Sequence, residues 1–293
     1  MNPAVRGVPP TVPMRLVLPG GKASVSDPRS WLRVAVWGAW LFGPMYVTAL
    51  AAARTGRGGN IERRWAHQAV RAARIDIEAT GLHHIEPGAP YVVAPLHEGF
   101  ADALVLHTLP LDFVWAVRDE LFDWRLLGPY LRASGQICVP THEGRAGYRA
   151  LLRGARDALA EGKSVVVFPQ GSILGIEAAF HPGAFRLADA TGASLLPVVM
   201  SGTHRVWEHP YHTTLRLDQR VRLQVLAPIP VGRAGSRMRD VEREMKAAAL
   251  QANPPPRRFD PERDGWWDDY PYEIDPTFVG LADRVRIHRG RTV

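Results

Sequence analysis

The stretch Tyr91–Leu106, YVVAPLHEGFADALVL, decides the fold and holds the first candidate for chemistry. It begins with a short apolar run that is typical of a buried strand. A loop containing His97 follows, and an apolar helical pattern begins close behind it. A strand that passes through a polar loop into a helix is the basic unit of an α/β protein.

Short apolar runs alternate with helical stretches over most of the chain. The expected strands are Arg74–Glu78, Tyr91–Ala94, Phe113–Val117, Gln136–Val139, Ser164–Phe168, Ser194–Met200 and Val221–Val225. The expected helices are Ile61–Arg74, Ala101–Thr108, Leu121–Ala133, Arg145–Glu161, Ala184–Ala190 and Ser236–Ala252. This alternation predicts an α/β fold, in which a central, mostly parallel sheet is flanked by helices.

Composition divides the chain into four expected parts. Residues 1–30 are rich in Pro and Gly and predict a flexible lead, and residues 31–58 predict a membrane-associated helical segment. Residues 59–252 form the expected α/β domain, which ends before three consecutive prolines. Residues 253–293 form a C-terminal tail that is first aromatic and acidic and then basic, and its sequence leaves open whether it folds back on the domain.

The run from Val34 to Ala53 contains no charged residue and has Arg33 and Arg54 at its two ends. Its length is about enough to span a bilayer, but Gly43-Pro44 interrupts a helix in its middle. Basic residues on both sides also give no orientation by the positive-inside rule. We therefore expect a helical pair that dips into one leaflet, and a buried core helix is the alternative.

The charge of the chain is strongly basic. Of its 293 residues, 36 are Lys or Arg and 29 are Asp or Glu, which gives a net charge of +7 and a pI near 10.0. A basic surface favours an anionic partner such as a lipid headgroup or an acidic carrier, and a solvated Arg-rich surface is the alternative. No nucleic-acid-binding motif is present, so no nucleic acid is expected. The single cysteine, Cys138, excludes an internal disulfide framework.

His97 and Asp102 are five residues apart, a spacing that an ideal helix would rotate by about 140°. They can meet only if His97 lies in the loop or the first helical turn, where its ring can turn back toward the carboxylate. An imidazole held in this way has a fixed tautomer and can act as a general base. His107 and Asp112 have the same spacing but no strand-to-loop entry, so we interpret them as structural.

A second candidate lies at Lys163–Ser172, KSVVVFPQGS, where an apolar strand ends in a tight turn. Backbone amides near Gly171 and Ser172 could hold an oxyanion or a phosphate. The ordinary alternative is a simple strand-exit turn. The block lacks both the Gly-x-Ser-x-Gly pattern of serine hydrolases and the Gly-rich loop with Lys of nucleotide-binding proteins.

Together these blocks resemble the glycerolipid acyltransferases of the lysophosphatidic acid acyltransferase (1-acylglycerol-3-phosphate acyltransferase) type. That family has a His followed by four residues and an Asp, here HEGFAD, and then a Phe-Pro-Glu-Gly-Thr-like block, here FPQGS. The blocks WAVRDELF, LLGPYLRASGQICVP, FHPGAF and LLPVVMSGT also follow the family order. The resemblance covers roughly residues 74–230.

The resemblance implies a set of site residues. His97 and Asp102 would be catalytic, and the expected substrate-binding residues are Arg118, His142, Arg145, Arg149, Phe168, Pro169, Gln170, Gly171 and Ser172. Three positions depart from the family pattern, because Gln170 replaces a Glu, and Ile173 and His142 stand where arginines are usual. These departures predict an altered acceptor site, in which Arg145 or Arg149 could replace the missing arginines.

The implied activity is an O-acyl transfer in phospholipid biosynthesis. A fatty acyl group would move from acyl-CoA or acyl carrier protein, as co-substrate, to a lipid hydroxyl, with a lysophospholipid favoured over a neutral glycolipid or other lipid alcohol. The expected location is the cytoplasmic face of the cell membrane, with monotopic or peripheral attachment to the membrane surface. The alternatives are an inactive lipid-binding protein that keeps the fold, and a thioesterase or lipid hydrolase.

No cofactor or metal is expected to take part. His204, Glu208, His209 and His212 lie close together in sequence and have side chains that ligate metals. Pro210 interrupts any helix that could align them on one face, so we interpret this segment as a polar loop.

Overall fold

The computed structural model describes residues 15–18, 21–22, 47, 50–51, 54–55, 58–99, 101–125, 127–206, 214–251 and 273–291. The predicted membrane-associated segment lies almost wholly outside these residues and stays a prediction. In the part of the chain that the structure describes, no helix combines the length and apolar character needed to cross a membrane.

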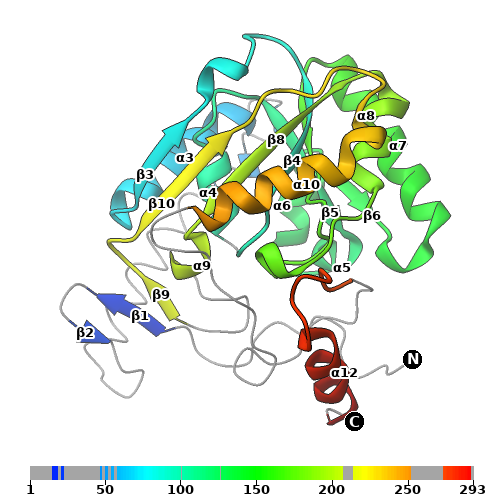
Figure 1. Cartoon of the computed structure of the whole chain (residues 1–293). Helices are drawn as coiled ribbons and strands as arrows, with labels where there is room; N and C mark the ends of the chain where they lie inside the picture. Colours follow the sequence, from blue (N-terminus) through cyan, green and yellow to red (C-terminus); the bar gives the residue numbers. More distant parts are fainter. Residues whose placement is uncertain are drawn as a thin grey trace.

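The centre of the molecule is a seven-stranded sheet (Figure 1). Its strands are β3 (Asp76–Thr80), β4 (Tyr91–Pro95), β5 (Phe113–Arg118), β6 (Ile137–Val139), β7 (Ser164–Val166), β8 (Ser194–Ser201) and β10 (Arg220–Val225). They lie in the order β3-β10-β8-β4-β7-β5-β6, and every neighbouring pair is parallel except β8 with β10. The predicted α/β fold with a mostly parallel sheet is therefore confirmed.

Helices cover both faces of this sheet. The helices are α3 (Gly58–Ala72), α4 (Ala101–Leu106), α5 (Asp119–Phe122), α6 (Leu127–Ala133), α7 (Arg145–Ala160), α8 (Gly183–Thr191), α9 (Thr203–Val206), α10 (Ala234–Leu250) and α12 (Leu281–Arg291). Helices α7, α8 and α10 pack on one face, and α3 and α4 pack on the other (Figure 1). All five residues of β4 are buried, which places the strand that precedes His97 at the centre of the core.

The predicted helix Leu121–Ala133 is wrong, because the structure has two helices, α5 and α6, with a turn between them. The chain doubles back so closely that a Cβ atom on Gly128 would lie 1.9 Å from the carbonyl oxygen of Phe122. Arg132 of α6 also donates a 2.7 Å hydrogen bond to this carbonyl. Only Gly permits this approach, so a continuous helix is excluded.

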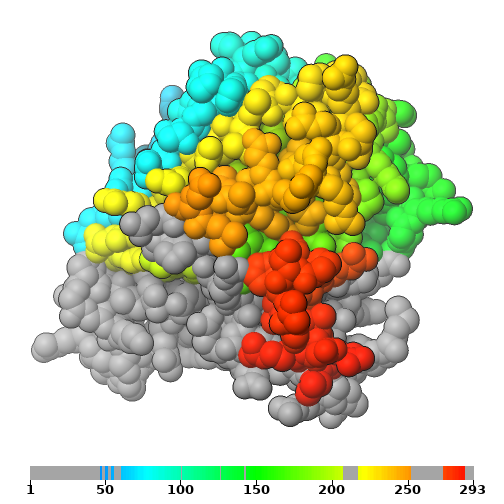
Figure 2. Space-filling view, viewed as in Figure 1, coloured from blue at the N-terminus to red at the C-terminus, as the bar shows by residue number. Residues whose placement is uncertain are grey.

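Several elements outside the main sheet were not predicted. Part of the predicted flexible lead forms strands β1 (Arg15–Leu18) and β2 (Gly21–Lys22), and β1 pairs with β9 (Thr214–Arg216). The C-terminal tail includes α12, whose residues Leu281 and Val285 pack against the main domain. In Figure 2 the described residues of the tail, in red, lie directly below α10 on the visible face.

Candidate active site

The site is built at the carboxyl end of the parallel strands, where α/β proteins place their ligands. His97 follows β4, Phe168 to Ser172 follow β7, and Arg118 is the last residue of β5. A cavity of about 470 Å³ opens at this edge. Residues from all three positions line it, so strands that are neighbours in the sheet bring blocks far apart in the sequence to one place.

His97 lies in the loop before α4, and Asp102 lies in the first turn of that helix. The His97 ring turns back as the spacing required, and its Nδ1 atom lies 2.5 Å from Asp102 Oδ2. The same oxygen accepts hydrogen bonds from the backbone N–H groups of Glu98 at 2.7 Å and Gly99 at 3.0 Å. Three donors thus converge on one oxygen of a carboxylate that is wholly buried.

The exposed side of His97 faces the cavity. Its side chain is 18% exposed, whereas that of Asp102 is 0% exposed. The ring stacks on Phe168, with centroids 3.6 Å apart and planes 12° apart, and Phe168 in turn stacks on Trp115. Asp102 and Phe168 therefore fix the orientation of the imidazole, and its second nitrogen is the one left for chemistry.

The cavity wall is mostly apolar. The lining side chains without charge or strong polarity include Ala103, Trp115, Val117, Leu121, Trp124, Val139, Leu151, Val167, Phe168 and Ile173. These residues come from α4, β5, α5 and the turn after it, β6, α7 and the loop after β7. A cavity of this volume and character suits a hydrophobic ligand. The sequence analysis named only Phe168 and Ile173 among these residues.

Only part of the predicted substrate-binding set lines the cavity. Arg118, Phe168, Pro169, Gly171 and Ser172 do, and Arg118 forms an ion pair with Glu120 at 3.0 Å. His142 belongs to the 3₁₀ turn η3 (Thr141–Glu143), and its side chain lies outside the described residues.

Arg145 and Arg149 are exposed and do not line the cavity. The reason is the phase of α7, since Gly147 and Leu151 face the cavity and the two arginines lie on roughly the opposite side of the helix. In this arrangement the two arginines point away from the cavity, and their contact with the acceptor stays a prediction.

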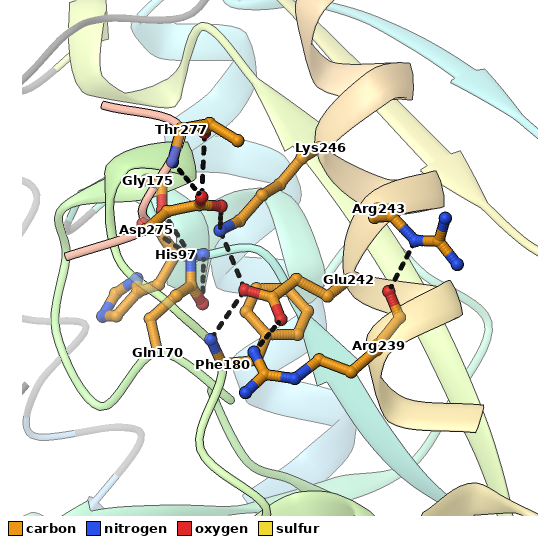
Figure 3. Close-up of polar contacts among 10 residues, drawn as sticks. All are labelled: His97, Gln170, Gly175, Phe180, Arg239, Glu242, Arg243, Lys246, Asp275 and Thr277. Carbon is orange, nitrogen blue, oxygen red and sulfur yellow. Dashed lines mark hydrogen bonds and ion pairs between the residues drawn. The ribbon is translucent and has the colours of Figure 1, made fainter. Parts of the chain in front are cut away.

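Gln170 does not line the cavity either, because its side chain is wholly buried behind it. Its Oε1 atom accepts a hydrogen bond from the His97 N–H at 3.2 Å. Its Nε2 atom donates to the carbonyl groups of Gly175 at 3.1 Å and His97 at 3.4 Å. The Gly175 N–H also donates to the His97 carbonyl at 2.8 Å, so Gln170 and Gly175 together clamp the backbone of His97 (Figure 3).

This clamp gives the Gln170 amide a structural role that can be tested. A carboxylate at position 170 has no N–H to donate, and it would face two carbonyl oxygens in a buried place. Gln170→Glu is therefore expected to lower the free energy of unfolding by about 1–3 kcal/mol, and thermal unfolding measures this. The loss should shrink at low pH, where a protonated carboxyl can donate again.

Gln170→Met is the matched control, since it removes the hydrogen bonds without adding charge, and its loss of stability should not depend on pH in this way. If Gln170→Glu unfolds at the wild-type temperature at neutral pH, the role assigned to the amide is wrong.

A second buried carboxylate lies next to His97 and was missed by the sequence analysis. Glu98 Oε2 accepts hydrogen bonds from Gly202 N–H at 2.9 Å, His204 Nδ1 at 3.0 Å and Thr203 Oγ1 at 3.4 Å. His204 is thus engaged with Glu98, and Glu208, His209 and His212 lie outside the described residues. The described residues contain no group of three or more His, Cys, Asp or Glu that could hold a metal ion.

Known proteins resemble this chain over the region that carries the site. Residues 76–201 match the family model described as Acyltransferase. A 1-acyl-sn-glycerol-3-phosphate acyltransferase of Chlamydomonas reinhardtii is 27% identical over 166 residues, which are 56% of this chain and 49% of that protein. The human 1-acyl-sn-glycerol-3-phosphate acyltransferase alpha is 30% identical over 130 residues, which are 43% of this chain and 46% of that protein.

A solved structure shares the fold. The crystal structure of the 1-acyl-sn-glycerophosphate (LPA) acyltransferase PlsC from Thermotoga maritima matches with a TM-score of 0.58 and 18% identity, covering 74% of this chain and 91% of that chain. Residues 76–201 therefore resemble the acyltransferase family, and the resemblance to the lysophosphatidic acid acyltransferase type is confirmed. The chain spans about half the length of the curated relatives that it matches.

Proposed function

We propose that this protein is an O-acyltransferase that moves a fatty acyl group from a thioester to the hydroxyl of a lipid. The observation that carries the proposal is the His97–Asp102 pair, which opens into a largely apolar cavity on a domain that resembles the acyltransferase family. The acyl donor is acyl-CoA or acyl carrier protein. Because both are soluble anionic donors, the enzyme would work on the cytoplasmic face of the membrane.

In the proposed reaction, His97 accepts the proton of the acceptor hydroxyl through the ring nitrogen that does not contact Asp102. The hydroxyl oxygen then forms a bond to the thioester carbon, and the Asp102 carboxylate stabilises the imidazolium. When the tetrahedral intermediate collapses, the carbon–sulfur bond breaks and His97 returns the proton to the thiolate. The products are the new ester and the free thiol.

The oxyanion of the intermediate needs a hydrogen-bond donor. The Gly171 N–H donates to the Phe168 carbonyl at 3.2 Å, so it already has a partner within the turn. Ser172 is a better candidate, because the residue lines the cavity and its buried hydroxyl has no hydrogen-bond partner among the described residues. In the proposed reaction, the Ser172 hydroxyl donates a hydrogen bond to the oxyanion.

Arg118 is the one arginine among the described residues that lines the cavity, and it is the group suited to an acceptor phosphate. A charged hydrogen bond contributes about 1.5–3 kcal/mol. Arg118→Met is therefore expected to lower kcat/KM for lysophosphatidic acid by about tenfold to a hundredfold and to leave a neutral monoacylglycerol nearly unaffected. Competition kinetics with both acceptors, in wild type and variant, measures this.

A neutral acceptor is the second candidate, and the observation in its favour is that Ile173 lines the cavity where the family has an arginine. It gains support if the wild type prefers the monoacylglycerol and Arg118→Met lowers both rates equally. A hydrolase would instead release free fatty acid at the same rate with and without a lipid acceptor.

A further inference from the structure

The loop that clamps His97 has a second set of partners on its other side. This site loop (Leu174–Phe180) contacts the C-terminal strap, which we define as residues Glu273–Phe278. The Ala179 N–H donates to the Glu273 carbonyl at 2.8 Å, and the Asp275 N–H donates to the Glu177 carbonyl at 2.8 Å. Ala178 and Ile274 form an antiparallel bridge between these bonds. The strap and the site loop therefore pair with each other like two short antiparallel strands.

Helix α10 holds the strap and the site loop together (Figure 3). The Lys246 ammonium forms ion pairs with Asp275 of the strap and, at 2.9 Å, with Glu242 one turn earlier on the helix. Glu242 Oε1 also accepts the Phe180 N–H of the site loop at 2.9 Å. The ammonium lies 5.5 Å from the centroid of the Phe180 ring. One buried cluster thus joins three segments.

Burial makes this cluster sensitive to geometry. The side chains of Lys246, Glu242 and Asp275 are 9%, 7% and 14% exposed. Taking such charges out of water is costly, and buried ion pairs of this kind add little net stability. Because buried ion pairs require a definite geometry, they instead hold the strap in one position against the site loop.

We propose that the C-terminal strap, anchored by Lys246, positions the catalytic base. The path of contact runs from Asp275 to the site loop, and from Gly175 of that loop to the backbone of His97 and to the Gln170 amide. The inference rests on the proposed function, in which His97 is the base. Asp275 and Lys246 do not line the cavity, so they act as positioning residues. The strap also lies outside residues 76–201, the part that matches the family model.

Asp275→Asn in the full chain tests this role. The amide keeps the size of the side chain. Its oxygen can still accept the Thr277 N–H, a bond of 3.0 Å in the wild type, but the charge that faces Lys246 is lost. A small displacement of a catalytic group can lower a rate by about 10²-fold. We expect kcat to fall by roughly tenfold to a hundredfold with KM unchanged, because the cavity lining is intact. Lys246→Arg should retain more activity than Lys246→Met.

Hydrogen–deuterium exchange gives a readout that does not need acyl transfer. Asp275→Asn should raise exchange both in the site loop and at residues 95–99. Asp189→Asn is the matched control, because Asp189 accepts the N–H groups of Ala234 and Gly235 at the far end of α10. It should lower the unfolding temperature without changing kcat or exchange at residues 95–99.

Combining Asp275→Asn with Gln170→Met decides whether the two act through one loop. We expect Gln170→Met to lower kcat only a little when Asp275→Asn is already present. If the two losses of kcat instead multiply in full, the proposal is overturned. Unchanged exchange at residues 95–99 in Asp275→Asn would also overturn it. If Asp275→Asn does not fold, Thr277→Ala replaces it and removes only the 2.8 Å bond to Asp275 Oδ1. If the wild type transfers no acyl group, the proposed function fails and the exchange measurements still decide the role of the strap.

Discussion

His97→Ala is expected to lower the rate of acyl transfer by about 10²–10⁴-fold, because it removes the imidazole that Asp102 orients toward the acceptor proton. The fold should persist, since the ring is partly exposed and the His97 backbone is held by hydrogen bonds to the Gln170 side chain and the Gly175 N–H. Kinetics with a thioester donor and lysophosphatidic acid, together with thermal unfolding of the same variant, measure both quantities.

The chain offers a control with the same local pattern. His107 precedes Asp112 by five residues, but burial and the nearby Arg63 lower the pKa of His107 to about 4. Its ring stacks on Phe113, with centroids 4.8 Å apart, and does not line the cavity. His107→Phe keeps this stacking and should retain nearly full activity. An inactive His107→Phe beside an active His97→Ala would show that the base is wrongly assigned.

The sheet could be predicted from the sequence because its strands are short apolar runs with both faces buried. Strand β4 is the clearest case, since every one of its residues is buried and no alternation with polar residues was needed to recognise it. The contact between His97 and Asp102 was also predictable. It lies within one strand–loop–helix unit, so only the local backbone decides it.

The support around His97 depends on contacts between distant parts of the chain. Gln170 lies 73 residues from His97, and His204 lies 106 residues from Glu98, and no local periodicity relates these positions. The amide at position 170 was therefore interpreted as a change in the acceptor site. Its role as a clamp follows only from the structure.

The orientation of α7 is different, because the sequence did contain the signal. Arg145 and Arg149 are four residues apart and share one side of a helix, whereas Gly147 and Leu151 share another. An amphipathic helix that packs its apolar side inward must turn these arginines to solvent. The resemblance to the family gave them a role at the site, whereas their helical phase turns them away from the cavity.

Asp102→Asn is expected to lower kcat by about 10²–10⁴-fold, an effect similar to that of removing the base. When His97 takes the proton, a positive charge forms 2.5 Å from Asp102 Oδ2, in a place where water cannot reach the carboxylate. A neutral amide cannot stabilise that charge, and the effective dielectric constant around a buried group is low. Because the charge develops only during the reaction, KM should change little.

The backbone around Asp102 distinguishes this electrostatic effect from loss of structure. In Asp102→Asn the amide oxygen can still accept the N–H groups of Glu98 and Gly99, so the loop should keep its shape. Asp102→Ala removes this acceptor as well, and it should cost stability in addition to rate. Asp112→Asn is the control, because Asp112 has the same spacing from His107 and its side chain is exposed. It should alter neither the rate of acyl transfer nor the stability. If Asp102→Asn transfers acyl groups within a few-fold of the wild type while Asp102→Ala unfolds early, the carboxylate is only a loop anchor, and His97 works without an electrostatic partner.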